Sequence, residues 1–252
     1  MATKCLLILE YFTRYLFTVL PINLLEITAI VAGIYFINKK PDTLVINKYL
    51  VKFLWFTLLV EITAKYASIA YFSEYEIFGF IKDTVFVKPY WLYNTFDLVF
   101  FSFYAYYFNS FLINNRLKKL FKAVIFMFLF ICVLNLLLSG MFFKGTSILI
   151  SIFGTLLLLV VIISFYFDLL KSDKIVNLKK YLPIYISFGV LVYSLCTTPL
   201  GLFSQYFKAI NQNYVVLRTN ILLGINIIMY GTFIIGFIVC AKSNPNKKEL
   251  LN

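Results

Sequence analysis

The sequence predicts an all-α membrane protein, a single domain of residues 1–252 built as a bundle of seven transmembrane helices. Seven apolar stretches of about 20 residues run through the chain, and hydrophobic residues make up 62% of it. The mean hydropathy of +0.89 is too high for a soluble domain. About 20 apolar residues span the hydrocarbon core, where the backbone must satisfy its own hydrogen bonds. Each stretch is therefore expected to be a helix.

Charged and amide-rich clusters separate the expected spans. The clearest are residues 38–41, 114–119 and 171–174, which follow the first, third and fifth spans. Pro21 interrupts the start of the first span, and Pro199 is expected to bend the outer end of the sixth. The predicted helices cover residues 16–37, 53–72, 91–113, 121–140, 147–167, 182–202 and 219–240.

Lys and Arg residues are distributed unequally between the two ends of this predicted bundle. Fifteen fall on one side and seven on the other. By the positive-inside rule the N-terminus is expected outside and the C-terminus in the cytoplasm. The net charge of +12 then reflects helix-flanking residues that contact anionic lipid, rather than a nucleic-acid site. Residues 1–15 lack a small-residue cleavage site, so they are not expected to be a removable signal peptide.

The residue types that most enzymes need are missing or scattered. The chain has no His, which excludes His-based acid–base catalysis and the common zinc hydrolase sites. Its four Cys residues show no CxxC spacing. We therefore expect no catalytic residues, no metal site and no cofactor, and the sequence favours a protein without enzymatic activity.

Ionisable residues inside the spans are the most informative feature. A charge at the bilayer centre costs at least about 2.5–3.5 kcal/mol and normally faces the bundle interior or a cavity. Four such residues lie inside the first three spans: Glu26, Glu61, Lys65 and Asp97. Their depth is similar, roughly 9–17 Å from the outer end. Three acids against one base leave an excess of negative charge, which a proton or a cationic ligand would balance.

Uncharged polar residues share helix faces with these charges. Asn94 is three residues before Asp97, and Asn226 is four before Tyr230. The sequence thus predicts a polar pocket in the outer half, lined by Glu26, Glu61, Lys65, Asn94, Asp97, Asn226 and Tyr230. The alternative is a buried network that only fixes helix packing.

Two further expectations concern packing and the inner boundary. Small residues let transmembrane helices approach closely, so five glycines are candidates for such contacts: Gly154, Gly189, Gly224, Gly231 and Gly236. Asp168, at the inner end of the fifth span and before Lys171, is expected to be a solvated boundary residue.

Several segments resemble a family of uncharacterised bacterial seven-helix inner-membrane proteins. The resemblance covers most of the chain and rests on the Glu residues of the first two spans and on residues 91–94, 168–175, 183–189, 226–230 and 233–237. It implies a location in the bacterial inner membrane, and it implies no biochemical activity.

Three classes of function remain open. A receptor-like sensor would use the outer pocket for a small ligand from outside and its basic inner loops to dock a cytoplasmic signalling partner. An ion- or proton-coupled transporter would use the same carboxylates as ion sites. A membrane scaffold would have no ligand. The sequence favours the sensor, with the lipid bilayer as its surroundings and no nucleic acid as partner.

Overall fold

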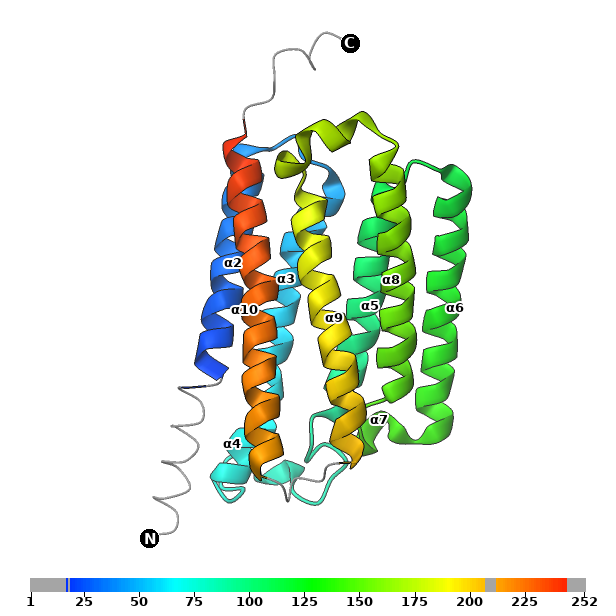
Figure 1. The fold of residues 1–252 in the computed structure, drawn as a ribbon. Helices are drawn as coiled ribbons and strands as arrows, with labels where there is room; N and C mark the ends of the chain where they lie inside the picture. The colour runs from blue at the N-terminus through cyan, green and yellow to red at the C-terminus, as the bar shows by residue number, and fades with distance from the viewer. Residues whose placement is uncertain (1–16, 18, 207–211, 244–252) are drawn as a thin grey trace.

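A computed structural model describes residue 17, residues 19–206 and residues 212–243; the leading segment 1–15 lies outside them. Within this part the chain is helical, with no strand, and its long helices follow one common axis (Figure 1). Seven helices have 20 residues or more: α2 (Leu20–Lys39), α3 (Val45–Ala64), α5 (Tyr90–Phe111), α6 (Asn115–Ser139), α8 (Ile148–Leu170), α9 (Leu182–Tyr206) and α10 (Gln212–Lys242). Short elements join them: α4 (Tyr66–Phe72), η2 (Gly79–Ile81), α7 (Met141–Lys144) and η3 (Asp173–Lys180).

Five of these helices are long and apolar enough to cross a membrane, namely α2, α6, α8, α9 and α10. The predicted all-α bundle with lipid-contacting helices is therefore confirmed at this level. Helices α3 and α5 are not among the five. They carry Glu61, Asp97 and several tyrosines and asparagines, which lower their mean hydropathy.

The second predicted span differs most from the observed helices. Its helix begins at Val45 instead of residue 53, because Lys48 and Lys52 interrupt the apolar pattern but not the helix. Long Lys side chains can extend towards water while their helix continues. At the other end the span is divided at Lys65, the residue between α3 and α4. Pro21 lies in the first turn of α2, where its missing N–H removes no helical hydrogen bond.

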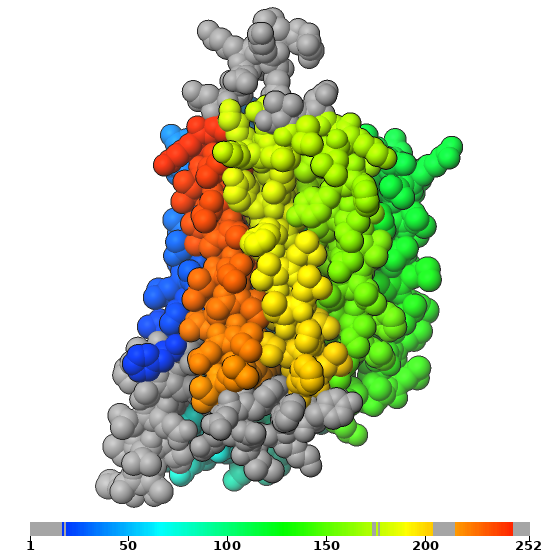
Figure 2. Space-filling view, in the orientation of Figure 1, coloured from blue at the N-terminus to red at the C-terminus, as the bar shows by residue number. Residues whose placement is uncertain are grey.

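The helices form an elongated bundle with α5 near its centre. Helix α10 packs between α2 and α9, and α5 contacts α3, α6, α8 and α9. Figure 2 shows α10 and α9 side by side on one face, with α8 next to them and α6 at the edge. Helices α2 and α10 run in the same direction (Figure 1). Glu26 pairs with Tyr230 and Gly33 lies against Phe237, so contacting residues differ by 204 positions along both helices.

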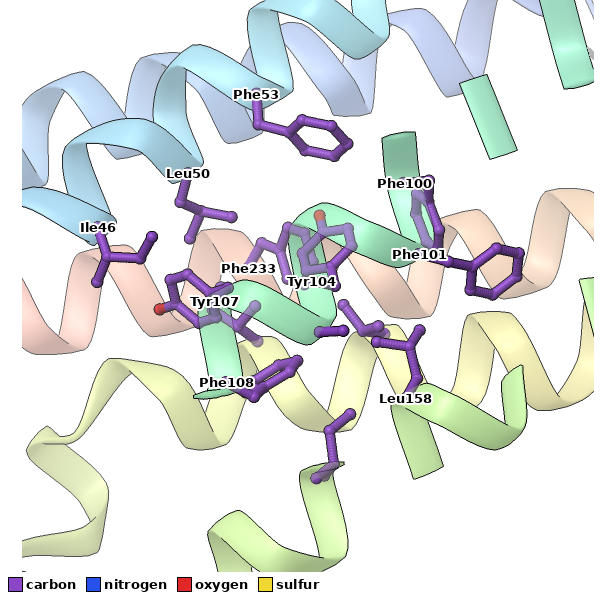
Figure 3. Packing of buried hydrophobic residues seen from close by; sticks show 14 of the residues in the cluster. Ile46, Leu50, Phe53, Phe100, Phe101, Tyr104, Tyr107, Phe108, Leu158 and Phe233 are labelled. Carbon is purple, nitrogen blue, oxygen red and sulfur yellow. The ribbon is translucent and has the colours of Figure 1, made fainter. Parts of the chain in front are cut away.

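Aromatic side chains fill the bundle between this central region and the end that carries most Lys and Arg residues, here called the basic end. The ring of Phe53 on α3 stacks on Phe103 of α5, with 4.1 Å between centroids, and meets Tyr104 edge-on. Figure 3 shows Tyr104, Tyr107 and Phe108 of α5 among side chains from α3, α8 and α10. These three α5 side chains are fully buried. Edge-to-face and stacked pairs of this kind add to the packing energy.

Three of the five glycines expected at helix contacts do lie against another helix: Gly154, Gly189 and Gly236. A Cβ on Gly154 would lie 2.3 Å from the ring of Phe101, so no larger residue fits without a shift. The expectation is wrong for Gly224 and Gly231, which have no such neighbour within 4 Å. Gly33 was not predicted, yet a Cβ there would lie 2.7 Å from Val51.

Asp168 lies at the partly exposed inner end of α8, as expected, and it also binds the turn between α5 and α6, which the sequence did not indicate. Its Oδ2 accepts hydrogen bonds from the backbone N–H of Ile113 at 2.7 Å and of Asn114 at 3.3 Å. These N–H groups belong to the turn between α5 and α6 and have no helical partner of their own. The carboxylate of α8 thus holds this turn at the basic end.

Candidate functional site

Glu26 and Tyr230 form the centre of the polar region, at the contact between α2 and α10. The Tyr230 hydroxyl donates a hydrogen bond of 2.5 Å to Oε1 of Glu26. Only 1% of Glu26 is exposed. Its second carboxyl oxygen, Oε2, is buried and has no hydrogen-bond partner among the described residues. Because buried polar atoms are nearly always paired, this oxygen requires an explanation.

Helix α3 brings an acid and a base to the same place. The Glu61 carboxyl lies within hydrogen-bonding range of the Glu26 carboxyl, and Lys65 interacts electrostatically with both carboxyl groups. Glu61 and Lys65 are each partly exposed. Four of the predicted pocket residues therefore come together from three helices, and we refer to Glu26, Glu61, Lys65 and Tyr230 as the carboxylate cluster.

Asp97 of α5 approaches this cluster through a tyrosine that the sequence analysis did not single out. The phenol of Tyr193 on α9 interacts electrostatically with Asp97, Glu61 and Glu26. Tyr104 of α5 interacts with both Tyr193 and Glu26. Tyr193 is thus within electrostatic reach of Asp97 and of both Glu residues. A single Tyr in an apolar span gives no signal by itself, so only its depth could have indicated Tyr193.

Asn94 does not join the carboxylate cluster, although it shares a helix face with Asp97. Its Nδ2 donates to the carbonyl oxygens of Phe142 at 3.2 Å and Gly145 at 2.8 Å. Its Oδ1 accepts the backbone N–H of Ser147 at 2.8 Å. The side chain, which is fully buried, thus holds the connection that contains α7. Its predicted place in the pocket is corrected by these contacts, because the connection folds back over the start of α5.

Two asparagines line the α2–α10 contact about one turn from Glu26. Asn226 is buried, and its Nδ2 donates to the Leu222 carbonyl of its own helix at 2.8 Å. With the 204-residue offset between α2 and α10, Asn23 lies at the level of Ile227, the residue after Asn226. Asn23 is 7% exposed, and its Oδ1 has no hydrogen-bond partner among the described residues. Asn23 was missed because one amide in the first turn of an apolar span resembles a helix-end residue.

The cluster is directly connected to the loop between α4 and α5. Tyr66 follows Lys65, and its hydroxyl donates to the Phe86 carbonyl at 2.7 Å. The indole N–H of Trp91 donates to the same hydroxyl at 3.1 Å. Beside these groups lies an apolar cavity of about 470 Å³, lined by Ile62, Thr63, Tyr66, Ile69, Phe78, Phe80, Ile81, Phe86 and Trp91. A displacement of Lys65 would therefore be transmitted to this loop through the adjacent residue, Tyr66.

The available chemistry is that of charge and hydrogen bonding. In the described part of the chain, no group of three or more His, Cys, Asp or Glu side chains is arranged to hold a metal ion. The carboxylate cluster contains two carboxyl groups, one ammonium and one phenol, and its carboxyl groups can bind protons and cations. No protein-family model, no curated protein and no solved structure matches the chain.

Proposed function

We propose that the chain is a receptor-like sensor of the bacterial inner membrane, which responds to a proton or small cation bound at the carboxylate cluster. Seven spans, with the N-terminus outside, place the cluster in the outer half. The unequal distribution of Lys and Arg between the two ends supports this orientation. Helices α3 and α5 count as spans in this proposal because they run along the common axis of the long helices (Figure 1) and pack against them. The bacterial location rests on the family resemblance alone.

The observation that carries the proposal is the surplus of acid inside the bundle. Glu26 and Glu61 approach each other from different helices, while Lys65 is the one basic side chain among the described residues that interacts with both of them. Two carboxyl groups in contact do not both ionise without a balancing charge. A proton or cation that enters or leaves would alter the contact between α2, α3 and α10.

The same helices offer a route to the basic end. Helices α2 and α10 carry Glu26 and Tyr230 and run side by side to Lys39 and Lys242. At that end the Lys40 ammonium donates a hydrogen bond to the Ser243 carbonyl oxygen, which joins the chain after α2 to the end of α10. Displacement of one helix against the other at the cluster would therefore change the basic surface. In this proposal a cytoplasmic signalling partner docks there.

A proton- or ion-coupled transporter is the second candidate. Pro199 within α9 and the division at Lys65 are the kinds of helix irregularity found near transporter sites. The same acids would then serve as ion sites during transport rather than as an input to signalling.

Trp91 provides a direct test. The chain has two Trp residues, and in a Trp55→Phe variant the remaining indole reports on the hydrogen bonds with Tyr66. We expect its fluorescence in lipid nanodiscs to change as pH is varied across the ionisation range of the acids, and the change to disappear in Glu26→Gln and Glu61→Gln. Asp42→Asn, at an exposed acid, is the control that keeps the response.

Flux measurements separate the two candidates. Vesicles that contain the protein and a trapped pH dye should show no proton or Na⁺ flux beyond that of empty vesicles if the chain is a sensor. A flux that Glu26→Gln removes would establish the transporter. If the Trp91 fluorescence depends on neither pH nor cations, both the sensor and the transporter proposals are contradicted. The membrane scaffold without a ligand then becomes the favoured function.

A further inference from the structure

We infer that the carboxylate cluster, together with Asn23, forms a site for one desolvated monovalent cation of the Na⁺ type. This inference rests on the proposed function and deepens it by naming the ligand and one additional residue. Two buried acceptor oxygens without partners, Oδ1 of Asn23 and Oε2 of Glu26, carry the inference.

The two oxygens come from one face of α2. Asn23 and Glu26 are three residues apart, and both belong to the buried side of that helix. Exposed fractions of 7% and 1% leave little access for bulk water. Tyr230 binds the other Glu26 oxygen and so leaves Oε2 available. The Glu61 carboxyl lies within hydrogen-bonding range of the Glu26 carboxyl, and two acceptor groups this close need a proton or a cation between them. Asn23 Oδ1, one turn away, also has no donor, which favours a cation that contacts all three groups.

The chemistry of the donors favours a hard cation. Asn23 offers an amide oxygen, and Glu26 and Glu61 offer carboxyl oxygens, which are the ligands that hard metal ions prefer. In the part of the chain that the structure describes, the immediate charges are two carboxylates and one ammonium, since Lys65 interacts with both acids. One positive charge makes this set neutral, whereas a divalent ion would leave it positive.

A second asparagine at the other end of the bundle supplies a matched control. Asn109 is 1% exposed, and its Oδ1 also has no partner among the described residues. Its Nδ2 donates to the Lys118 carbonyl near the α5–α6 turn. Asn109 and Asn23 thus share residue type, burial and an unpaired oxygen, but only Asn23 shares a helix face with Glu26.

The test is the melting temperature of the full chain in detergent, measured in NaCl and in choline chloride at equal ionic strength and fixed pH. We expect NaCl at saturation to raise it by roughly 5 °C relative to choline. Asn23→Leu should abolish the difference. Asn109→Leu should lower the melting temperature in both salts and keep the difference. Because Asn23→Leu could impair folding, Asn23→Asp is the second variant, and it keeps an oxygen ligand and should retain Na⁺ binding.

Equilibrium binding of radioactive Na⁺ measures the number of ions bound per chain. We expect one ion in the parent protein and none in Glu26→Gln. Equal melting in Na⁺ and choline, or a Na⁺ effect unchanged in Asn23→Leu, overturns the inference. If Trp91 still responds to pH in that case, the proposed function stands with a proton as its ligand. If Trp91 responds to neither pH nor Na⁺, both the inference and the proposed function fail.

Discussion

Two buried tyrosines, one in each half of the bundle, show how the halves differ. Near the basic end, the Tyr107 hydroxyl donates to Oδ1 of Asn47 at 3.0 Å, and the Asn47 amide donates to the Thr43 hydroxyl at 2.9 Å. In the half nearer α4, Tyr230 donates to Glu26, whose other oxygen has no partner. In the first chain of hydrogen bonds, Tyr107 and Asn47 both have partners. In the second, one carboxyl oxygen of Glu26 receives no donor and remains available to a ligand.

The difference lies in charge as much as in hydrogen bonding. The half near the basic end is packed with rings, and its buried polar groups are largely neutral. Burial against Phe111 and Phe165 raises the pKa of Tyr181 to about 12, so this phenol stays neutral at physiological pH. The half nearer α4 contains Glu26, Glu61 and Lys65 within electrostatic reach of one another. We expect the first half to determine stability and the second to respond to the surroundings.

The largest expected effect tests the packed half. Phe165 of α8 is 1% exposed and contacts Phe108, Phe111 and Tyr181. Phe165→Ala should lower the free energy of unfolding by about 3 kcal/mol, because the lost ring leaves a cavity. The control is Phe126→Ala on α6, where the side chain is 71% exposed and should matter by less than about 0.5 kcal/mol. Equal losses in detergent denaturation would show that the aromatic core does not dominate stability.

Lys65 tests whether the other half is held by opposite charges. Lys65→Met should cost about 2 kcal/mol, because Glu26 and Glu61 lose the base that interacts with both. Neutralising an acid as well, in Lys65→Met with Glu61→Gln, should recover at least about 0.5 kcal/mol of the loss. Chemical denaturation of the two single variants and the double variant measures this coupling. Strictly additive losses would mean that the two side chains act independently.

The sequence predicted the helices and part of the site for physical reasons that can be stated. Long apolar runs identify helices, and a charge inside such a run has to face the interior. Charge and matched depth indicated Glu26, Glu61 and Lys65, and the spacing with Asn226 indicated Tyr230; the structure brings these four residues together. The division at Lys65 was not predicted, because Lys and Tyr are compatible with a continuing helix.

The errors and omissions involve neighbours that one helix cannot reveal. Asn94 was grouped with Asp97 by spacing, but the α7 connection takes up its side chain. Asn23 and Tyr193 carry no charge, so an apolar run conceals them. Gly224 and Gly154 look alike in sequence, and only Gly154 meets a ring from another helix. Which face of a helix meets which partner is decided by tertiary packing.

Substitutions at Asn94 and Asp168 compare how strongly the connections at the two ends of the bundle contribute to stability. Asn94→Ala should cost about 2 kcal/mol, because the buried Ser147 N–H loses its acceptor and two carbonyl groups lose a donor. Asp168→Ala should cost only about 1 kcal/mol, since Asp168 is partly exposed and water can replace it at Ile113. Thermal unfolding of both variants measures the difference. A greater loss for Asp168→Ala would indicate that the basic end is the more dependent on its connecting turn.

The smallest expected effect separates the two tyrosines most sharply. Tyr107→Phe should lower the free energy of unfolding by about 1 kcal/mol, because Asn47 loses its donor. The loss should be the same at every pH and in every salt, since no charge lies in that chain of hydrogen bonds. Tyr230→Phe removes a donor from Glu26, and its cost should be of similar size only while Glu26 is ionised.

The distinguishing measurement is therefore the slope of stability with pH and not its value at one pH. A donor to the ionised carboxyl favours that form, so removing it should lower stability further at high pH, where Glu26 is ionised, and leave low-pH stability nearly unchanged. Melting temperatures of Tyr230→Phe, Tyr107→Phe and the parent chain across one pH series give this slope. If the two variants run parallel to the parent throughout, Glu26 does not ionise in the folded bundle, and the contrast between the halves reduces to packing alone.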